Sequence, residues 1–471
     1  MLRGPFPDNG LVRGISDGIM LSADPAVREY AVALAKGAGA SVVRIPVNWA
    51  FHVAPKPPLA FDPTDPGSAA YNFAGIDAAV RSAVAGGLEP LLVVSHAPAF
   101  AEAPRRWPFA YAGSWAPSPQ ALGQFATALA RRYDGSFPDP LDPGRPLPRV
   151  NMFQAWNEPN LARYLEPQWV AEGPRWRAFS PLLYRQLLNA FYAGIKLVQA
   201  SDVVVAAGLA PTGDPPGTGR MAPLMFLQEL FCLGAPHSMG RPPCEGPAHF
   251  DVLAFHPLSV GNPDRAAPSS LDVSVSDAAK VTTLLARAVR LRTALPTTGK
   301  QVWVTELNWE SAPQSRHGVP PADQAAWISR ALHRLWVAGV QLVDWEFLVD
   351  PYPALIQVQL GGRRVAMSRP AGLYTLRSPG LRTAQPKPFL RGFELPFDPQ
   401  RINRRDVRVW ALVMAPGERP VLQRLRHHHW RSLALLRADR WGVVNAALRL
   451  AGPTRLRLVA DGVVSAAARV R

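Results

Sequence analysis

Two glutamates stand out because each closes an apolar run whose packing does not require a charge. Glu158 follows the run at 150–156 together with Asn157, and Glu306 follows the run that begins at Gln301. In a parallel α/β sheet or barrel, the carboxyl ends of strands hold catalytic side chains rigidly and leave them open to substrate. Paired carboxylates suit cleavage of a glycosidic bond, because one protonates the leaving oxygen while the other attacks the anomeric carbon or activates water. A surface or capping carboxylate is the alternative for either glutamate alone, and two of them beside aromatic residues favour chemistry.

Both glutamates lie in motifs that resemble one superfamily. Residues 156–160 read Trp-Asn-Glu-Pro-Asn, and residues 304–306 read Val-Thr-Glu. At these motifs the chain resembles the retaining glycoside hydrolases of clan A, a TIM-barrel superfamily that includes the cellulase-like family 5 and the xylosidase-like family 39. The resemblance covers roughly residues 10–395 and points to the clan, not to one family. It implies that Glu158 is the acid/base, that Glu306 is the nucleophile, and that Asn157 binds the sugar 2-hydroxyl.

Four further residues at or near expected strand ends are candidates for substrate binding. Arg44 lies within an apolar run, where an unpaired charge is costly, so it must meet a carboxylate. The resemblance pairs Arg44 with Glu306, and a structural salt bridge elsewhere is the alternative. His96 and His256 each close a run, and His96 is similar to the third-strand histidine of family 5; a satisfied core histidine is the alternative. Trp345 resembles the eighth-strand tryptophan that forms the floor of a sugar subsite, with a core tryptophan as the alternative.

The chain departs from the clan after the expected sixth strand. Families 5 and 39 commonly carry a tyrosine just after the sixth-strand histidine, whereas this chain reads His256-Pro257-Leu258. The role of that tyrosine near the nucleophile therefore cannot be transferred. We expect the orientation of Glu306 to depend more on Arg44.

Apolar runs and amphipathic segments alternate along most of the chain. This alternation predicts an α/β fold, a (β/α)8 TIM barrel whose strand ends meet at one mouth. All the candidate residues then lie at or near that mouth. Residues with only a packing role would be scattered through the core and would not gather at one edge. The eight expected strands are residues 12–20, 40–49, 88–96, 150–156, 203–210, 250–256, 301–309 and 340–347.

The C-terminal part of the chain has a different pattern. From Arg408 onward apolar residues alternate with period two, and turn signals separate short segments. We expect a catalytic barrel at residues 1–396 and a small β-sandwich accessory domain at 397–471. Packing on the barrel is favoured for this domain over glycan binding.

The charge of the chain is concentrated in the same region. The formal net charge is +16, and from Arg391 to Arg471 there are 16 arginines against six acidic residues. These arginines alternate with apolar residues and form no basic run, which favours a solvated basic face. We expect these arginines to face solvent and the protein to have no nucleic acid partner. The alternative is that they bind an acidic glycan, a cell-wall polymer or nucleic acid.

The two cysteines, Cys232 and Cys244, lie in an insertion at 211–248 that is rich in proline and glycine. Their spacing fits a disulfide that closes a loop in an oxidising compartment and is worth about 3 kcal/mol. Two free thiols are the alternative. A metal site is not expected, because the neighbouring His237 and His249 do not complete a known ligand spacing.

The sequence contains no apolar run long enough for a membrane span, and residues 1–20 lack the features of a signal peptide. Either the protein stays inside the cell or the sequence starts at the mature chain. The substrate class and the expected disulfide favour a secreted, extracellular protein. The pattern of residues indicates no oligomeric state.

These observations lead to a hypothesis about the reaction. Glu306 attacks the anomeric carbon of a β-type O-glycosidic linkage while Glu158 protonates the leaving oxygen, and water activated by Glu158 then releases the sugar. No cofactor is expected, and the substrate is an oligosaccharide, polysaccharide or glycoside whose sugar the sequence does not name. A transglycosylase that uses the same two acids and a glycan-binding protein on a degenerate barrel are the alternatives.

Overall fold

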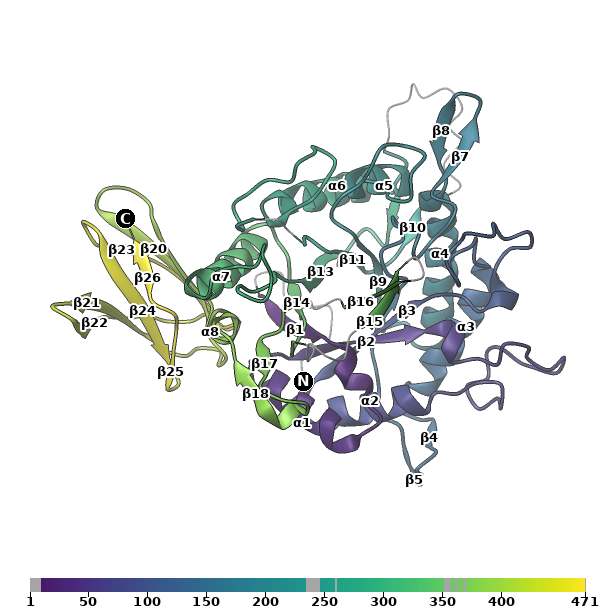
Figure 1. Ribbon diagram of the computed structural model, residues 1–471, viewed down its shortest axis with the longest axis horizontal. Helices are drawn as coiled ribbons and strands as arrows, with labels where there is room; N and C mark the ends of the chain where they lie inside the picture. Colours follow the sequence, from purple (N-terminus) through teal and green to yellow (C-terminus); the bar gives the residue numbers. More distant parts are fainter. Residues whose placement is uncertain are drawn as a thin grey trace.

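A computed structural model describes residues 10–233, 246–258, 261–350, 357–360, 363–366 and 370–470. Its central feature is a closed barrel of eight parallel strands, with helices around it and antiparallel sheets at one side (Figure 1). The strands follow one another around the barrel in the order β1-β14-β13-β11-β9-β6-β3-β2. The expected TIM barrel is therefore confirmed. The barrel strands are β1 (Val12–Ser16), β2 (Val42–Asn48), β3 (Glu89–Ser95), β6 (Met152–Ala155), β9 (Val203–Leu209), β11 (Val252–Phe255), β13 (Gln301–Leu307) and β14 (Leu342–Glu346).

The helices begin where the sequence offers a cap or a first-turn proline. Asp24 accepts a hydrogen bond from the N–H of Ala26, and Ser118 accepts one from Ala121, at the starts of two helices that each have proline in their first turn. The helices are α1 (Pro25–Gly37), α2 (Ala74–Ala85), α3 (Pro119–Arg132), α4 (Ser180–Val198), α5 (Pro223–Leu230), α6 (Ala278–Arg290), α7 (Pro321–Val337) and α8 (Pro388–Glu394).

Two expected elements are shorter than the sequence pattern indicates. The first strand ends at Ser16 instead of residue 20, because the Asp17 side chain accepts the N–H of Ile19 and starts a 3-10 turn. The amphipathic pattern of residues 277–295 predicts one helix, but that helix ends at Arg290, and Ala294–Leu295 forms a short strand. In both cases a local backbone preference ends an element that hydrophobic periodicity would continue.

Short hairpins, one parallel pair and single turns connect the barrel elements. The short pairs are β4 (Pro138–Asp139) with β5 (Asp142–Pro146), β7 (Trp169–Glu172) with β8 (Arg175–Ala178), β10 (Ala248–His249) with β12 (Ala294–Leu295), β15 (Gln357–Leu360) with β16 (Arg363–Ala366), and β17 (Tyr374–Leu376) with β18 (Ala384–Pro386). The 3-10 turns are Gly18–Leu21, Trp49–Phe51, Ala99–Ala101, Val275–Asp277 and Leu381–Thr383.

Side chains fill the barrel in alternation along each strand. Val42, Met152 and Leu342 belong to a cluster inside the barrel, whereas their neighbours Val43, Phe153 and Val343 belong to the larger cluster shared with the helices. This is the two-residue period of a strand. Polar side chains take over toward the carboxyl ends of the strands, where the candidate site lies.

Two antiparallel sheets follow α8 and enclose an apolar cluster of their own. One sheet contains β19 (Phe397–Arg401), β20 (Asp406–Leu412) and β23 (Val443–Arg449); the other contains β21 (Val421–Arg426), β22 (His429–Leu435), β24 (Thr454–Ala460), β25 (Val463–Val464) and β26 (Ala468–Val470). Phe397, at which the accessory domain was expected to begin, is the first residue of β19.

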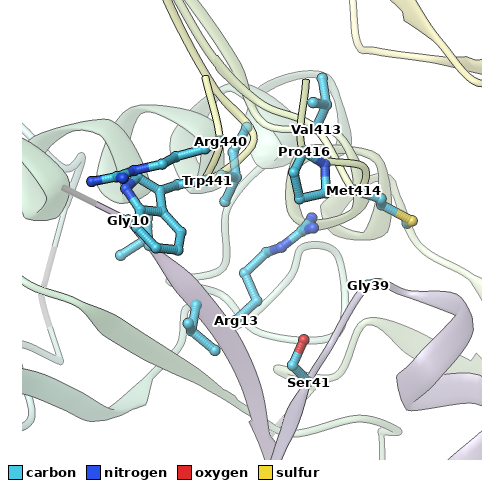
Figure 2. A pocket seen from close by; sticks show the side chains of 12 residues that line it. Gly10, Arg13, Gly39, Ser41, Val413, Met414, Pro416, Arg440 and Trp441 are labelled. Carbon is cyan, nitrogen blue, oxygen red and sulfur yellow. The ribbon is translucent and has the colours of Figure 1, made fainter. Parts of the chain in front are cut away.

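The C-terminal sheets lie beside α7 and α8 of the barrel (Figure 1). Trp410 of β20 stacks on His333 of α7 with ring centroids 4.8 Å apart and planes 9° from parallel. Arg13 of β1 donates to the backbone oxygens of Phe393 and Glu394 at the end of α8. Figure 2 shows Arg13 and Ser41 of the barrel and Trp441 of the C-terminal part lining one cavity between the two units. The two units therefore share a packed boundary.

Two expectations about the chain meet the structure only in part. Cys244 lies outside the described residues, so its disulfide with Cys232 stays a prediction, although no described cysteine is a free thiol. Among the described residues, no helix has the length and apolar character required to cross a membrane.

Candidate active site

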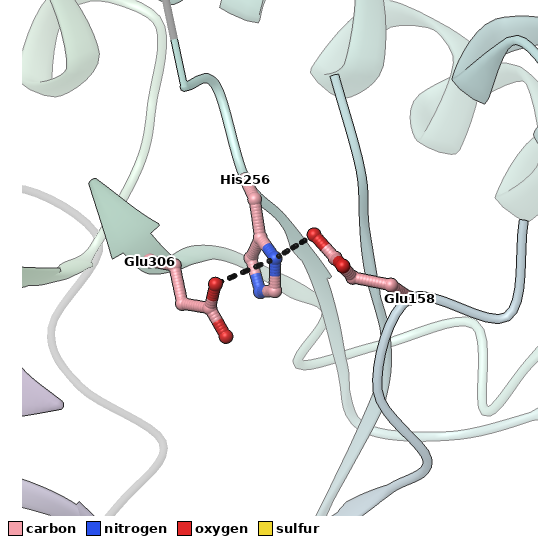
Figure 3. Close-up of side chains that lie close together, drawn as sticks. All are labelled: Glu158, His256 and Glu306. Carbon is pink, nitrogen blue, oxygen red and sulfur yellow. Dashed lines mark hydrogen bonds and ion pairs between the residues drawn. The ribbon is translucent and has the colours of Figure 1, made fainter. Parts of the chain in front are cut away.

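Three of the candidate residues meet at the mouth of the barrel. Glu158 follows β6, His256 follows β11 and Glu306 lies in β13, and Figure 3 shows the imidazole of His256 between the two carboxylates. His256 Nδ1 lies 3.1 Å from Glu158 Oε1 and 3.4 Å from Glu306 Oε2. One side-chain nitrogen or oxygen atom from each of the three residues lies within 4.8 Å of the other two. The two acids are thus close enough to act on opposite sides of one bond.

Arg44 connects this group to the neighbouring strands. Its Nη1 donates to Glu306 Oε1 at 2.7 Å and to Ser16 Oγ at 3.2 Å, and its Nη2 donates to Asn157 Oδ1 at 2.6 Å. The side chains of Arg44 and Glu306 are 7% and 11% exposed, so water screens this ion pair little. The expected contact between Arg44 and Glu306 is present, and Asn157 is held by the same guanidinium.

A bulge in β13 explains why two consecutive side chains face the same group. Val304 is paired with Val343 and Leu307 with Trp345, so Thr305 and Glu306 together stand opposite the single residue Asp344. In a regular strand, neighbouring side chains point to opposite faces, whereas a bulge re-aims one of them. Thr305 Oγ1 consequently lies 3.0 Å from His256 Nε2. Thr305 is a site residue that the sequence pattern did not reveal.

The Trp-Asn-Glu motif adopts an unusual backbone conformation. Trp156 has a φ of 70° and Glu158 a φ of 42°, values that are costly for residues other than glycine. The Trp156 indole N–H donates to the backbone oxygen of Tyr164, and the N–H of Glu158 donates to that of Gly208. These contacts hold the strained turn that directs Asn157 and Glu158 toward the barrel mouth.

Tyr164 is a second residue that the sequence pattern did not reveal. Burial, together with the charges of Glu158 and Glu306, raises the pKa of Tyr164 to about 12, although the charge of Arg163 and a hydrogen bond from Asn157 act in the opposite direction. Its phenol is therefore neutral at ordinary pH and available as a donor. Tyr164 lies in an irregular loop after the motif, where no periodicity or spacing points to it.

His96 lies beside this group and not within it. Its ring centroid is 5.2 Å from that of Tyr164, and its Nδ1 is hydrogen bonded to Ser95 Oγ at 2.8 Å. Burial lowers the pKa of His96, and the charge of Arg163 lowers it further, so the imidazole is neutral at pH 7. Within the described residues, the ring of His96 therefore contacts Tyr164, whose pKa responds to both glutamates.

The structure buries the side chain of Trp345 in the apolar cluster shared with the helices, contrary to the expectation that it lines a subsite. Trp345 is fully buried, with its ring against Trp309 and Phe389 and its indole N–H donating to the backbone oxygen of Ala371. It belongs to the apolar cluster shared with the helices, and it leaves no exposed ring face for a sugar. Its neighbour Glu346 accepts a hydrogen bond from Asn308 instead.

The donors of this site suit proton transfer better than a metal ion. Glu158, His256 and Glu306 are close enough to hold a cation among the described residues. However, Arg44 already neutralises Glu306 at 2.7 Å, and a guanidinium this close opposes a second positive charge. The expectation that no cofactor is needed stays a prediction.

Comparison with known proteins gives a fold and no family. No family model and no curated protein matches the chain. A solved family 39 glycoside hydrolase from Bacteroides cellulosilyticus WH2 is 17% identical, with a TM-score of 0.55 over 98% of this chain and 83% of that one. A glucosidase from Croceicoccus marinus is 13% identical, with a TM-score of 0.50 over 93% of both chains. The chain therefore has the TIM-barrel fold of solved glycoside hydrolases.

Proposed function

We propose that the protein is a retaining glycoside hydrolase that cleaves β-type O-glycosidic linkages by double displacement. The observation that carries this proposal is the pairing of Glu158 and Glu306, with side-chain oxygens within 4.8 Å across His256. Retaining enzymes place their carboxyl groups about 5 to 5.5 Å apart, whereas inverting enzymes need roughly 6.5 to 9.5 Å for a water molecule. The short separation favours direct attack by a carboxylate.

In the first step, a Glu306 oxygen forms a bond to the anomeric carbon while the bond from that carbon to the leaving oxygen breaks. Glu158 gives its proton to the leaving oxygen. Arg44 holds Glu306 in one orientation through the hydrogen bond from its Nη1. Because this contact exists before any sugar arrives, the nucleophile does not have to be ordered during the reaction.

In the second step, Glu158 takes a proton from water, and the resulting hydroxide attacks the anomeric carbon and releases Glu306. Both steps need a proton to move to and from Glu158. His256 lies against both carboxyl groups, with its Nε2 fixed by Thr305, so it keeps the acid and the nucleophile at a constant separation.

Asn157 and Tyr164 are the proposed contacts to the sugar. A guanidinium can only donate, so the Asn157 oxygen faces Arg44, while its amide nitrogen donates to Tyr164 and keeps a second N–H for a sugar hydroxyl. Tyr164 brings a neutral phenol close to both glutamates from the loop after β6, whereas Leu258 follows β11. We propose that it supplies the tyrosine that His256-Pro257-Leu258 lacks.

The test uses activated 2-fluoro glycosides of several sugars, which trap the covalent intermediate of retaining enzymes. Intact mass should rise by one glycosyl unit, and peptide mapping should place the label on Glu306. Glu306→Gln should not be labelled, whereas Glu346→Gln, a change of the same kind at the end of β14, should be. A label on another residue, or a first product of inverted configuration by NMR, would overturn the proposal.

The substrate and its location are part of the same proposal. The trapping panel identifies the accepted sugar, and product analysis with added acceptor sugars separates hydrolysis from glycosyl transfer. We propose secretion on the basis of a glycan substrate, and fractionation of producing cells tests it.

A further inference from the structure

Asp344 is a buried acid that the proposed reaction does not use. It lies in β14, level with Gly14 of β1 and Val42 of β2, one layer below the level of Ser16 and Arg44. Both carboxyl oxygens are buried without a hydrogen-bond partner among the described residues. A Cβ added to Gly14 would come within 1.7 Å of Asp344 Oδ1, so the carboxyl group lies directly over the backbone of β1. This site has room for an acid only because residue 14 is glycine.

Arg44 has one buried donor without a partner among the described residues. Its Nη atoms bind Glu306, Asn157 and Ser16, whereas its Nε is buried without a partner among the described residues. Asp344 stands opposite the β13 bulge that presents Glu306. The charge of Arg44 therefore acts on two carboxyl groups, and its guanidinium is hydrogen bonded only to that of Glu306.

Burial and the neighbouring charges act together on the pKa of Asp344. Burial raises the pKa of Asp344 well above its ordinary value; Arg44 of β2 lowers it and Glu306 of β13 raises it. The third neighbouring strand, β1, presents Gly14 and Ser16, which carry no charge. Burial and the charge of Glu306 thus both favour the protonated form of Asp344, whereas the charge of Arg44 favours the ionised form.

This balance changes in the proposed reaction. When Glu306 forms an ester with the sugar, it loses its negative charge, and Arg44 remains as a buried cation without a counter-ion. A buried charge that loses its partner is strongly unfavourable. Removing the charge of Glu306 also removes one of the two effects that keep Asp344 protonated.

We propose that Asp344 is a reserve counter-charge for Arg44, neutral while Glu306 is ionised and ionised while Glu306 is an ester. The inference rests on the proposed retaining mechanism. In the covalent step, the Glu158 proton goes to the leaving oxygen, and Asp344 separately releases its own proton to water. Asp344 takes a proton back when hydrolysis regenerates the Glu306 carboxylate. It is a positioning residue, because it acts on Arg44 and not on the sugar.

The test uses infrared difference spectroscopy on the whole protein, with Glu306→Gln as the neutral stand-in for the ester. A protonated carboxyl group has a carbonyl band that a carboxylate lacks. We expect a band in the wild type at pH 7 that disappears in Glu306→Gln, and its midpoint of ionisation should fall by roughly one pH unit or more. Labelling with [4-13C]aspartate should shift this band, which assigns it to an aspartate without a further variant. Glu346→Gln is the control and should leave the band in place.

Two results would overturn the inference. One is the absence of any protonated aspartate band in the wild type at pH 7. The other is an aspartate band that persists unchanged in Glu306→Gln. Both can be seen without turnover, so they are independent of the proposed function. If Glu306 is labelled but the band persists, the reserve charge is wrong and the proposed function stands. If the band responds to residue 306 but no glycoside labels the protein, the coupling between the two acids stands and the proposed reaction is wrong.

The kinetic consequence concerns Asp344→Asn, which keeps the shape of the neutral acid but cannot ionise. We expect covalent labelling of Glu306 to slow by roughly tenfold, because the charge of Asp344 no longer stabilises Arg44 in the ester. A tenfold change corresponds to a pKa difference of about one unit. Asp344→Glu can still ionise and should recover part of the rate if it folds. Labelling at the wild-type rate in Asp344→Asn would contradict the proposal.

Discussion

At the scale of single residues, Arg44 determines the geometry of the candidate site. Its side chain is hydrogen bonded to groups from β1, β13 and the turn after β6, so one planar fork orients the nucleophile and Asn157 together. Lysine carries the same charge on a single nitrogen, so it cannot donate to Glu306 and Asn157 from two separate nitrogens as arginine does. The site therefore depends on the shape of this cation as well as on its charge.

Arg44→Lys should accordingly lower kcat/KM by roughly 100-fold or more, within the range found when one preorganised donor is lost. The measurement is steady-state kinetics on the glycoside that the trapping panel identifies. Arg28→Lys is the matched control, because Arg28 is also buried but bonds to Ser22 and Ser82 near α1. A value of kcat/KM within twofold of the wild type in Arg44→Lys would contradict this role.

The hydroxyl of Tyr164 gives a second prediction at this scale. Tyr164→Phe keeps the ring beside His96 but removes the donor near Glu158 and Glu306. We expect a loss of roughly tenfold in kcat/KM without loss of thermal stability, because one hydrogen bond to the reacting sugar is worth about 1 to 1.5 kcal/mol. The pKa of about 12 also predicts that no tyrosine ionisation appears in the pH profile below about pH 10. Tyr192→Phe, on α4, is the control and should leave both measurements unchanged.

The sequence could predict the acids of this site but not their complete surroundings. Glu158 and Glu306 close apolar strands, and strands of a barrel must end at a shared mouth, so their proximity follows from the pattern. Thr305 could not be predicted, because a bulge depends on how β13 pairs with β14. The subsite role of Trp345 followed from the resemblance alone, which does not show that its ring packs in the cluster shared with the helices.

At the scale of elements, the loop after β3 is attached to the loop after β6 by backbone hydrogen bonds. The N–H of Ala116 donates to the backbone oxygen of Glu166, and the N–H of Glu166 donates to that of Ser114. The side chain of Glu166 is buried here, and one of its oxygens has no hydrogen-bond partner among the described residues. This junction belongs to the loop that follows the turn with Glu158. We expect its stability to depend on whether the Glu166 carboxyl group is ionised.

The stability of this junction should depend on pH. Burial raises the pKa of Glu166 from 4.5 to about 7; Arg106 lowers it and Glu102 raises it. Because the folded value is the higher one, the stabilisation is complete below pH 4.5 and is lost as the pH rises through about 7. The free energy of unfolding should fall relative to Glu166→Gln across this window, by at most about 1.4 kcal/mol per pH unit.

Denaturant unfolding at a series of pH values measures this difference between the wild type and Glu166→Gln. Glu172→Gln is the control, because Glu172 is exposed on the β7–β8 hairpin. Parallel stability curves for the wild type and Glu166→Gln from pH 4.5 to 7 would contradict the prediction.

Most elements of the barrel could be predicted from the sequence, because eight apolar runs alternate with amphipathic segments. Their ends were less certain where a side chain competes with the backbone, as at Asp17. The short hairpins were missed because pairs such as β4 with β5 bury little surface and leave no hydrophobic pattern.

At the scale of the whole molecule, the C-terminal sheets and the barrel form one packed structure. Trp410, Leu412 and Val443 belong to the same apolar cluster as the barrel and its helices. His333 of α7 contacts the Asp398 carboxylate at 2.6 Å in addition to stacking on Trp410. The basic C-terminal part is therefore attached through apolar and ionic contacts to the helix that follows the Glu306 strand.

Trp410→Ala should consequently destabilise the barrel as well as the C-terminal sheets. Trp410 is fully buried at the boundary, and removing a buried aromatic side chain typically costs about 3 to 5 kcal/mol. Calorimetry of the full chain should show one transition at a lower Tm, with labelling of Glu306 unchanged well below that temperature. Trp430→Ala is the matched control, because Trp430 of β22 is partly exposed and contacts Arg457. A barrel transition that keeps its wild-type Tm in Trp410→Ala, beside a separate transition of the C-terminal sheets, would show instead that the two units unfold independently.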